Sequence, residues 1–124
     1  MSRQADEQGI REAIAHYVEG MRTHTVATMK EGFHEQAILC GYLGDHLIAG
    51  PIAELYGWAS ENPSPAATGE HFECEILSIG VTGRVAIAAV RETGHDGAVI
   101  DHFHLLKVDG RWWIVSKLWD TEPQ

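Results

Sequence analysis

The stretch that decides the fold is a long hairpin: Ala98-Val-Ile-Asp-His-Phe-His-Leu-Leu-Lys-Val108, then Asp109-Gly110, then Arg111-Trp-Trp-Ile-Val-Ser-Lys-Leu-Trp119. Asp-Gly between two runs rich in β-branched and aromatic residues is a strong signal for a two-residue turn, because both central residues of that turn take positive φ. The turn fixes the cross-strand pairs. We expect Lys107 opposite Trp112, Leu105 opposite Ile114, Phe103 opposite Ser116 and Asp101 opposite Leu118.

The same register predicts the content of each face of the hairpin, because side chains alternate between the two faces of a strand. One face carries a single carboxylate among apolar residues: Asp101 with Phe103, Leu105, Trp112, Ile114 and Leu118. The other carries Ile100, His102, His104, Leu106 and Val108 with Trp113, Val115, Lys117 and Trp119. We therefore expect helices and a cavity to cover the first face, and a partner to cover the second.

Length and composition exclude several classes of protein. The 124 residues suit one domain, spanning residues 1–124, with 44% hydrophobic residues. A net charge of -9 argues against nucleic-acid and anionic-membrane partners, which favour basic surfaces. The N-terminal residues lack the pattern of an export signal, so we expect a cytoplasmic location. Cys40 and Cys74 are expected to be buried free thiols.

The rest of the chain predicts helices followed by strands. An apolar stripe predicts a helix over about Ala5–Met21, Thr25 can cap a second helix over Val26–Glu31, and Gly50-Pro51 can open a third. From Gly69 the hydrophobic period changes to two. The expected strands are Ala37–Tyr42, His46–Ala49, Glu70–Ile79, Arg84–Thr93, Ala98–Val108 and Arg111–Trp119. The pattern indicates an α+β domain with the helices on one face of an antiparallel sheet.

Four segments carry a resemblance to a known superfamily: His16-Tyr-Val-Glu-Gly20, Gly32-Phe-His34, Ala37-Ile-Leu39 and Val108-Asp-Gly-Arg-Trp-Trp-Ile-Val115. In this order they resemble the nuclear transport factor 2-like superfamily, in particular its putative lumazine-binding or SnoaL-like branch. The resemblance implies a cone-shaped fold of three N-terminal helices on a strongly curved antiparallel sheet. It implies no single activity, because this superfamily includes isomerases, cyclases, dehydratases and transport adaptors.

The superfamily includes the ketosteroid isomerases, whose site residues can be sought here. Tyr17, late in the first helix, matches their oxyanion tyrosine, and Val99-Ile100-Asp101 resembles the strand of their protonated aspartate. Counting back from the turn glycine places His102 at that position instead. Gly41 matches the position of their general base, so no carboxylate is available there to remove a proton.

Tyr17 and Asp101 each allow a functional and a structural interpretation. Tyr17 would donate its hydroxyl to a ligand oxygen, or it would be a core tyrosine whose hydroxyl finds a partner within the protein. Asp101 lies on the apolar face, where loss of water favours its neutral form, so it could donate to a ligand. It could equally be a structural carboxylate bonded to a helix amide or to Ser116.

Three histidines are the remaining candidates for site residues. His34 would lie at the pocket rim, or it would cap the end of the second helix. His102 and His104 point the same way and could chelate a metal, but two ligands are too few, so we expect no metal and no cofactor. We expect this histidine pair to lie at a subunit interface, beside Lys117.

We expect a homodimer, joined through the outer sheet face, whose conical pocket binds a small apolar or carbonyl-bearing molecule. The ligand-binding residues would be Tyr17, His34, Tyr56, Asp101, Phe103 and Leu118. The alternative is an enzyme, an isomerase, cyclase or dehydratase, with Tyr17 and Asp101 as oxyanion donors and His34 or His102 replacing the missing base. A third interpretation is a purely associative domain.

Overall fold

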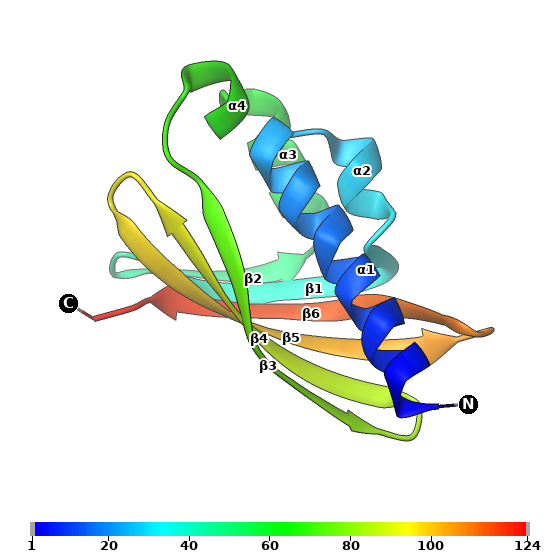
Figure 1. Cartoon of the computed structure of the whole chain (residues 1–124). Coiled ribbons are helices and arrows are strands. Elements are labelled where there is room, and N and C mark those ends of the chain that lie inside the picture. Colours follow the sequence, from blue (N-terminus) through cyan, green and yellow to red (C-terminus); the bar gives the residue numbers. More distant parts are fainter. Residues whose placement is uncertain (1, 124) are drawn as a thin grey trace.

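The computed structural model describes residues 2–123 and places the helices on one side of a curved sheet (Figure 1). The Ser2 side chain caps the first helix by accepting a hydrogen bond from the Ala5 backbone N–H. The residue after the helix, His24, is its C-cap and takes left-handed φ and ψ. The helices are α1 (Arg3–Thr23), α2 (Val26–Lys30), α3 (Ala53–Glu61) and α4 (Pro65–Thr68).

Six strands form one sheet in the order β2-β1-β6-β5-β4-β3. Their bounds are β1 (Phe33–Leu43), β2 (His46–Pro51), β3 (Glu73–Thr82), β4 (Val85–Gly94), β5 (Gly97–Val108) and β6 (Arg111–Thr121). Strands β3 to β6 form an antiparallel meander, while β1 pairs with β6 in parallel. The expected α+β architecture, with the helices covering a strongly curved sheet, is confirmed.

Some element boundaries differ from those expected from the sequence. Pro51 is the last residue of β2 rather than the first of a helix, and α3 begins after Ile52. The segment after α3 leads into α4, a single extra turn in which Ser64 caps the helix and Pro65 is its first residue. The parallel pairing of β1 with β6 was not predicted, because hairpin signals report only pairs of strands adjacent in sequence.

The Asp109-Gly110 turn has the predicted form, with φ of 49° and 80° at its two residues. Next to the turn, the expected pairs of Lys107 with Trp112 and of Leu105 with Ile114 are confirmed. Beyond them the register shifts, because Ile114 pairs with Leu105 whereas Ser116 pairs with His104. The extra residue is a β-bulge, which exchanges the two faces of β6 beyond it.

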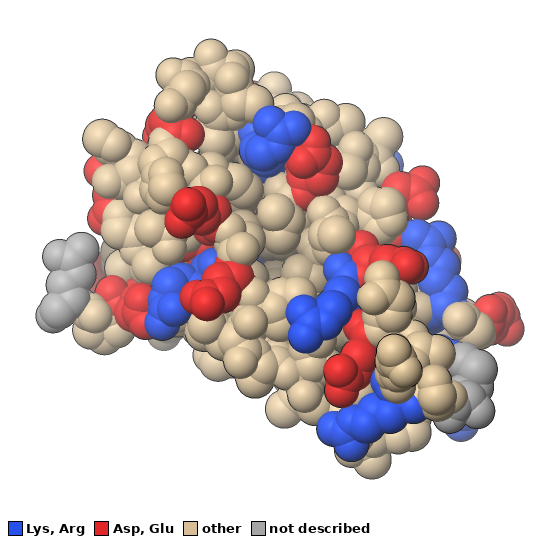
Figure 2. All heavy atoms as spheres, viewed as in Figure 1, with Lys and Arg blue, Asp and Glu red and all other residues tan. Residues whose placement is uncertain are grey.

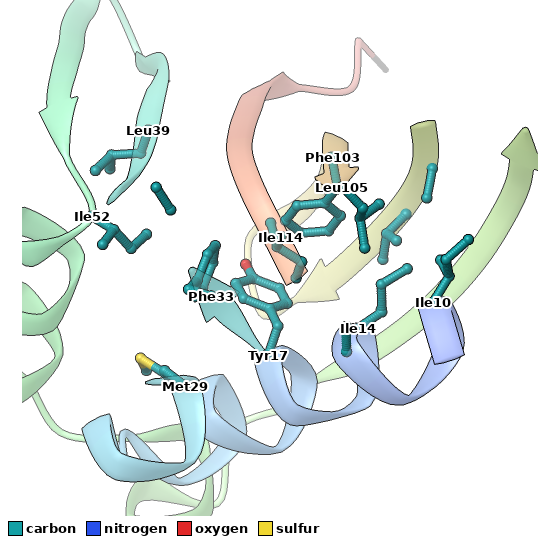
Figure 3. Packing of buried hydrophobic residues seen from close by; sticks show 14 of the residues in the cluster. Ile10, Ile14, Tyr17, Met29, Phe33, Leu39, Ile52, Phe103, Leu105 and Ile114 are labelled. Carbon is teal, nitrogen blue, oxygen red and sulfur yellow. The ribbon is translucent and has the colours of Figure 1, made fainter. Parts of the chain in front are cut away.

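The core lies between α1 and the inner face of the sheet. Figure 3 shows Tyr17 of α1 among the side chains of Phe33, Phe103 and Ile114. The Tyr17 ring meets Phe33 and Phe103 edge to face, with centroids 5.7 Å and 5.0 Å away. Trp112 and Ile114 are buried against this core, as predicted from the turn. Packing of α1 therefore fixes the position of the Tyr17 side chain above the sheet.

The surface shown in Figure 2 carries acidic and basic side chains interspersed, many of them side by side. Arg91, for example, pairs with both Glu75 and Glu122. Within residues 2–123, no helix is long and apolar enough to cross a membrane.

Candidate ligand-binding site

A pocket of about 590 Å³ lies between α3, the ends of α1 and β1, and the β4/β5 hairpin. In Figure 1 this hairpin rises from the sheet on the side where α4 lies. Much of the wall is apolar, with contributions from Leu39, Leu43, Ile48, Leu55, Trp58 and Trp119. The exposed polar residues of its edge are Glu54, Glu70, His71, His95 and Asp96. A concave apolar space with a few polar groups is typical of a small-molecule site.

Lys117 and Trp119 line this pocket because of the bulge in β6. We expected both residues on the outer face and Leu118 on the inner face, and this is wrong. The extra residue in β6 pairs Lys117 with Phe103 and Trp119 with Asp101, so both side chains turn inward. Leu118 instead pairs with His102, is 47% exposed and lies on the outer face, away from the pocket.

A cluster of four ionisable side chains adjoins the pocket: the buried Tyr17, Asp101 and Lys117 and the half-buried Glu92. The Tyr17 hydroxyl donates a hydrogen bond of 2.6 Å to Oε2 of Glu92. Burial, followed by the nearby Asp101 and Glu92 carboxyl groups, raises the pKa of Tyr17 well above its usual range. Tyr17 is therefore a phenol with its proton committed to Glu92, rather than a donor aimed at the pocket.

Asp101 is fully buried behind the pocket wall, with 0% of its surface exposed. The Lys117 ammonium lies 3.2 Å from its Oδ1, yet neither Asp101 oxygen accepts a well-oriented hydrogen bond from any group in residues 2–123. Burial, and then hydrogen bonding with Glu92, raises the pKa of Asp101 to about 9, although Lys117 acts in the opposite direction. A neutral carboxyl group leaves no negative charge without a donor at this buried position.

Lys117 is held from several sides. Its ammonium lies 3.9 Å from the centroid of the Trp119 ring and 5.9 Å from that of Tyr17. The aromatic faces stabilise the positive charge at a site where only 6% of the residue is exposed. Because Lys117 and Glu92 both line the pocket, while Tyr17 and Asp101 do not, the first pair faces a ligand and the second pair lies behind it.

Of the residues predicted from the sequence, Tyr17, Asp101 and Phe103 come together around this cluster. Phe103 is fully buried against the Tyr17 ring and belongs to the core rather than to the pocket wall. Tyr56, on α3, is half-buried with its ring 6.5 Å from that of Phe33, and it also lies outside the pocket lining.

The histidines lie elsewhere. His34 contacts the Trp113 ring edge to face at 6.3 Å on the outer face, and its Nδ1 accepts a hydrogen bond from the Gln36 backbone N–H. It is therefore not at the pocket rim, because it follows the inward Phe33 in the strand. His102 and His104 are exposed on the outer face, but not beside Lys117, which the bulge turns inward.

Gly41, at the position of the missing base, is covered by Trp119. A Cβ atom at residue 41 would lie 2.3 Å from Cδ2 of the Trp119 indole. The indole thus occupies the space into which a side chain would project. Glycine is needed here for close approach of the ring rather than for positive φ.

Sequence reasoning missed Glu92 and Lys117 as site residues. Glu92 is the polar member of an otherwise apolar alternation in the predicted strand 84–93, and this could have marked it as inward-facing. Lys117 between Ser116 and Leu118 gave no comparable signal, because the bulge that turns it inward has no sequence mark. Among the described residues, no group of three or more His, Cys, Asp or Glu side chains is arranged to hold a metal ion.

The comparisons with known proteins agree with the fold. A family model described as "Putative lumazine-binding" matches residues 5–120. Crystal structures of NTF2-like proteins of unknown function are similar over almost the whole chain. The protein from Shewanella baltica is 30% identical in sequence, with a TM-score of 0.86. The match covers 100% of this chain and 99% of the Shewanella chain. The protein from Methylobacillus flagellatus is 31% identical, with a TM-score of 0.84. The match covers 99% of this chain and 96% of the Methylobacillus chain.

One relative carries an activity in its name. The protein named aldolase FrzH, from Cladobotryum sp, is 26% identical over 108 residues, which are 87% of this chain and 85% of that protein. Family names and fold do not by themselves define a reaction. The function must therefore be argued from the pocket.

Proposed function

The chain belongs to the putative lumazine-binding family of NTF2-like proteins, and from this premise we propose that it binds a small, mainly apolar molecule bearing a carbonyl group. The observation that carries the proposal is the pair of ionisable side chains, Lys117 and Glu92, in the largely apolar wall of the 590 Å³ pocket. Apolar walls hold the body of such a ligand, and the ammonium donates to its oxygen.

The neutral form of Asp101 supports this role for Lys117. If Asp101 were ionised, it would compensate the charge of the ammonium 3.2 Å away. Because burial favours its protonated form, the ammonium keeps a charge that a carbonyl oxygen can satisfy. The acidic edge of the pocket, with Glu54, Glu70 and Asp96, favours a neutral or cationic ligand over an anionic one.

A matched pair of planar molecules tests the proposal. 9-Fluorenone and fluorene have nearly the same shape, but only fluorenone carries a carbonyl group. A hydrogen bond to a charged donor contributes about 1.5–3 kcal/mol, so fluorenone should bind about 10- to 100-fold more tightly. The preference should be lost in Lys117→Met. Equal affinity of both molecules for the wild-type protein would contradict a carbonyl-binding site.

We also propose that the protein forms a homodimer through the outer sheet face. Large apolar side chains are exposed there in the single chain: Ile38, Val85, Ile87, Leu106, Val108 and Leu118. Ile87, on β4, is 61% exposed. A patch of this kind favours an isologous contact with a second copy of the chain. The cytoplasmic location expected from the sequence likewise stays a prediction.

A second candidate function is an enzyme of the SnoaL or ketosteroid isomerase type. The specific observation in its favour is the cluster of Tyr17, Glu92, Asp101 and Lys117 beside the pocket, since clusters of ionisable side chains at a pocket are frequent in active sites. The name of the relative, aldolase FrzH, is also consistent with carbonyl chemistry. In such an enzyme, Lys117 would be the oxyanion donor. Tyr17, which we expected in that role, donates its hydroxyl proton to Glu92 instead.

A further inference from the structure

Two carboxyl groups of the cluster face different surroundings. Asp101 pairs with Val90 across β5 and β4, and Glu92 lies two residues farther along β4, so the two carboxyl groups point from the same face. Asp101 is fully buried, whereas Glu92 is half-buried and lines the pocket. Of these two carboxyl groups, only that of Glu92 is therefore open to a ligand in the pocket.

Complete burial raises the pKa of Asp101 and so favours its neutral form. Glu92 is then the carboxyl group of the pair that contacts the pocket and that a ligand can reach. Environments that separate two neighbouring carboxyl groups in this way define which one can act as a base.

We propose that Glu92 is the base of this site and removes a proton from the carbon next to the ligand carbonyl, with Lys117 holding the resulting enolate oxygen. This rests on the proposed function, the binding of a carbonyl compound, and assigns the base that Gly41 does not supply. The ligand class is thereby narrowed to enolisable ketones and aldehydes.

The residues of the site account for every proton and electron pair that moves in this step. The C–H bond breaks, its proton goes to a Glu92 carboxylate oxygen, and its electron pair forms the C=C bond of the enolate. The carbonyl π electrons move to the oxygen, whose negative charge lies beside the Lys117 ammonium. Return of a proton from Glu92 to carbon regenerates the ketone. No oxidant, reductant or metal takes part in the step.

Tyr17 acts as a positioning residue for this base. The 2.6 Å hydrogen bond from the Tyr17 hydroxyl fixes the orientation of the Glu92 carboxylate at the pocket wall. Tyr17 is itself immobilised by the aromatic rings of Phe33 and Phe103. A base held in one orientation by such a supported partner loses little freedom when the reaction begins.

Hydrogen–deuterium exchange of 2-tetralone in D₂O tests the assignment, because this ketone has acidic protons next to its carbonyl. We expect the wild-type protein to accelerate exchange above buffer at the same pD, as followed by proton NMR. General base catalysis contributes about 10²- to 10⁴-fold, so Glu92→Gln should lose at least about a hundredfold of the acceleration. Glu73→Gln, which removes an exposed carboxylate of β3 outside this pocket, should leave exchange unchanged.

Binding of 9-fluorenone, measured on the same samples, separates the two proposals. Fluorenone binding without accelerated exchange in the wild-type protein overturns the assignment of Glu92 and leaves the proposed function standing. Absence of fluorenone binding overturns the proposed function itself. If Glu92→Gln does not fold, Glu92→Asp replaces it. That variant withdraws the carboxylate by one methylene and should bind fluorenone while losing exchange.

Lys117 offers a rival route to the same exchange, through an imine formed between its amine and the ketone with loss of water. Treatment with borohydride in the presence of 2-tetralone distinguishes the two routes, because it reduces an imine to a stable amine. We expect no added mass on Lys117 by peptide mass spectrometry. A reduced adduct at this residue, together with undiminished exchange in Glu92→Gln, would overturn the proposal.

Discussion

The Tyr17 hydroxyl lies 2.6 Å from Oε2 of Glu92 and donates a hydrogen bond to it, joining the first helix to the fourth strand across the core. The two residues are 75 positions apart in the sequence. A phenol buried in an aromatic core and a carboxylate at a pocket wall thereby become one unit. This bond ties the stability of the fold to the geometry of the candidate site.

Replacing Tyr17 with Phe should destabilise the protein, because the Glu92 carboxylate loses its donor in a region with little water. Removing one partner of a buried hydrogen bond costs about 1–3 kcal/mol. Urea unfolding followed by circular dichroism measures the change. Tyr42→Phe, which removes a hydroxyl from a 44% exposed residue, is the matched control and should change stability by less than about 0.5 kcal/mol. Equal losses in the two variants would argue against the Tyr17–Glu92 bond.

Replacing Gly41 with Ala should also destabilise the protein, since the new Cβ would lie within 2.3 Å of the Trp119 indole. Overpacking of this kind costs about 1–3 kcal/mol, and the displaced indole should change the near-ultraviolet circular dichroism. Gly57→Ala in α3 is the control, because its Cβ meets nothing within 4 Å. It should be neutral or stabilising by up to about 1 kcal/mol. An unperturbed Gly41→Ala protein would contradict the close approach of Trp119.

The pH dependence of stability should report on Asp101. Its pKa is about 3.9 in an unfolded chain and is raised to about 9 in the folded protein, so the folded state binds the extra proton between these values. The contribution of Asp101 to stability is therefore fully present below pH 4, falls as the pH rises and is lost above pH 9.

Asp101→Asn removes this titration. Urea unfolding at pH 5, 7 and 9 should show wild-type stability falling more steeply with pH than that of the variant. Asp45→Asn, in the exposed turn between β1 and β2, should keep the wild-type slope. Parallel pH profiles for the wild type and Asp101→Asn would mean that Asp101 is ionised in the folded state.

The proposed homodimer can be tested at Ile87. Because Ile87 is 61% exposed in the single chain, Ile87→Glu should leave the protomer folded. In a face-to-face dimer it would bury an unpaired carboxylate, and this should convert the dimer to a monomer at micromolar concentration. Light scattering after size exclusion measures the mass. Ser60→Glu adds the same charge on the exposed side of α3 and should stay dimeric. A wild-type mass of one chain would contradict the dimer.

The fold could be predicted from the sequence because its signals are local. The Asp109-Gly110 turn, the apolar stripe of α1 and the change of hydrophobic period near Gly69 each depend on neighbouring residues. Together they led to the α+β class and to the inward positions of Trp112 and Ile114, which the structure confirms.

The site was less predictable because it depends on one irregularity. No sequence pattern marks the bulge between Ile114 and Ser116. The bulge nevertheless exchanges the faces of the sheet on which Lys117 and Leu118 lie. Asp101 was correctly expected to be buried, since its strand neighbours are apolar. Its neighbours Lys117 and Glu92 could not be predicted, because they come from two other strands. No local sequence pattern specifies which residues of three strands meet.

The infrared carbonyl stretch of bound 9-fluorenone tests the central claim most directly, because it reports whether the ligand oxygen accepts a hydrogen bond from Lys117. We predict that the band shifts to lower frequency on binding to the wild-type protein, relative to fluorenone in an apolar solvent, and that Lys117→Met removes most of this shift while fluorenone stays bound. A bound carbonyl band at the apolar-solvent frequency in the wild type, or the same band in both proteins, would contradict the account.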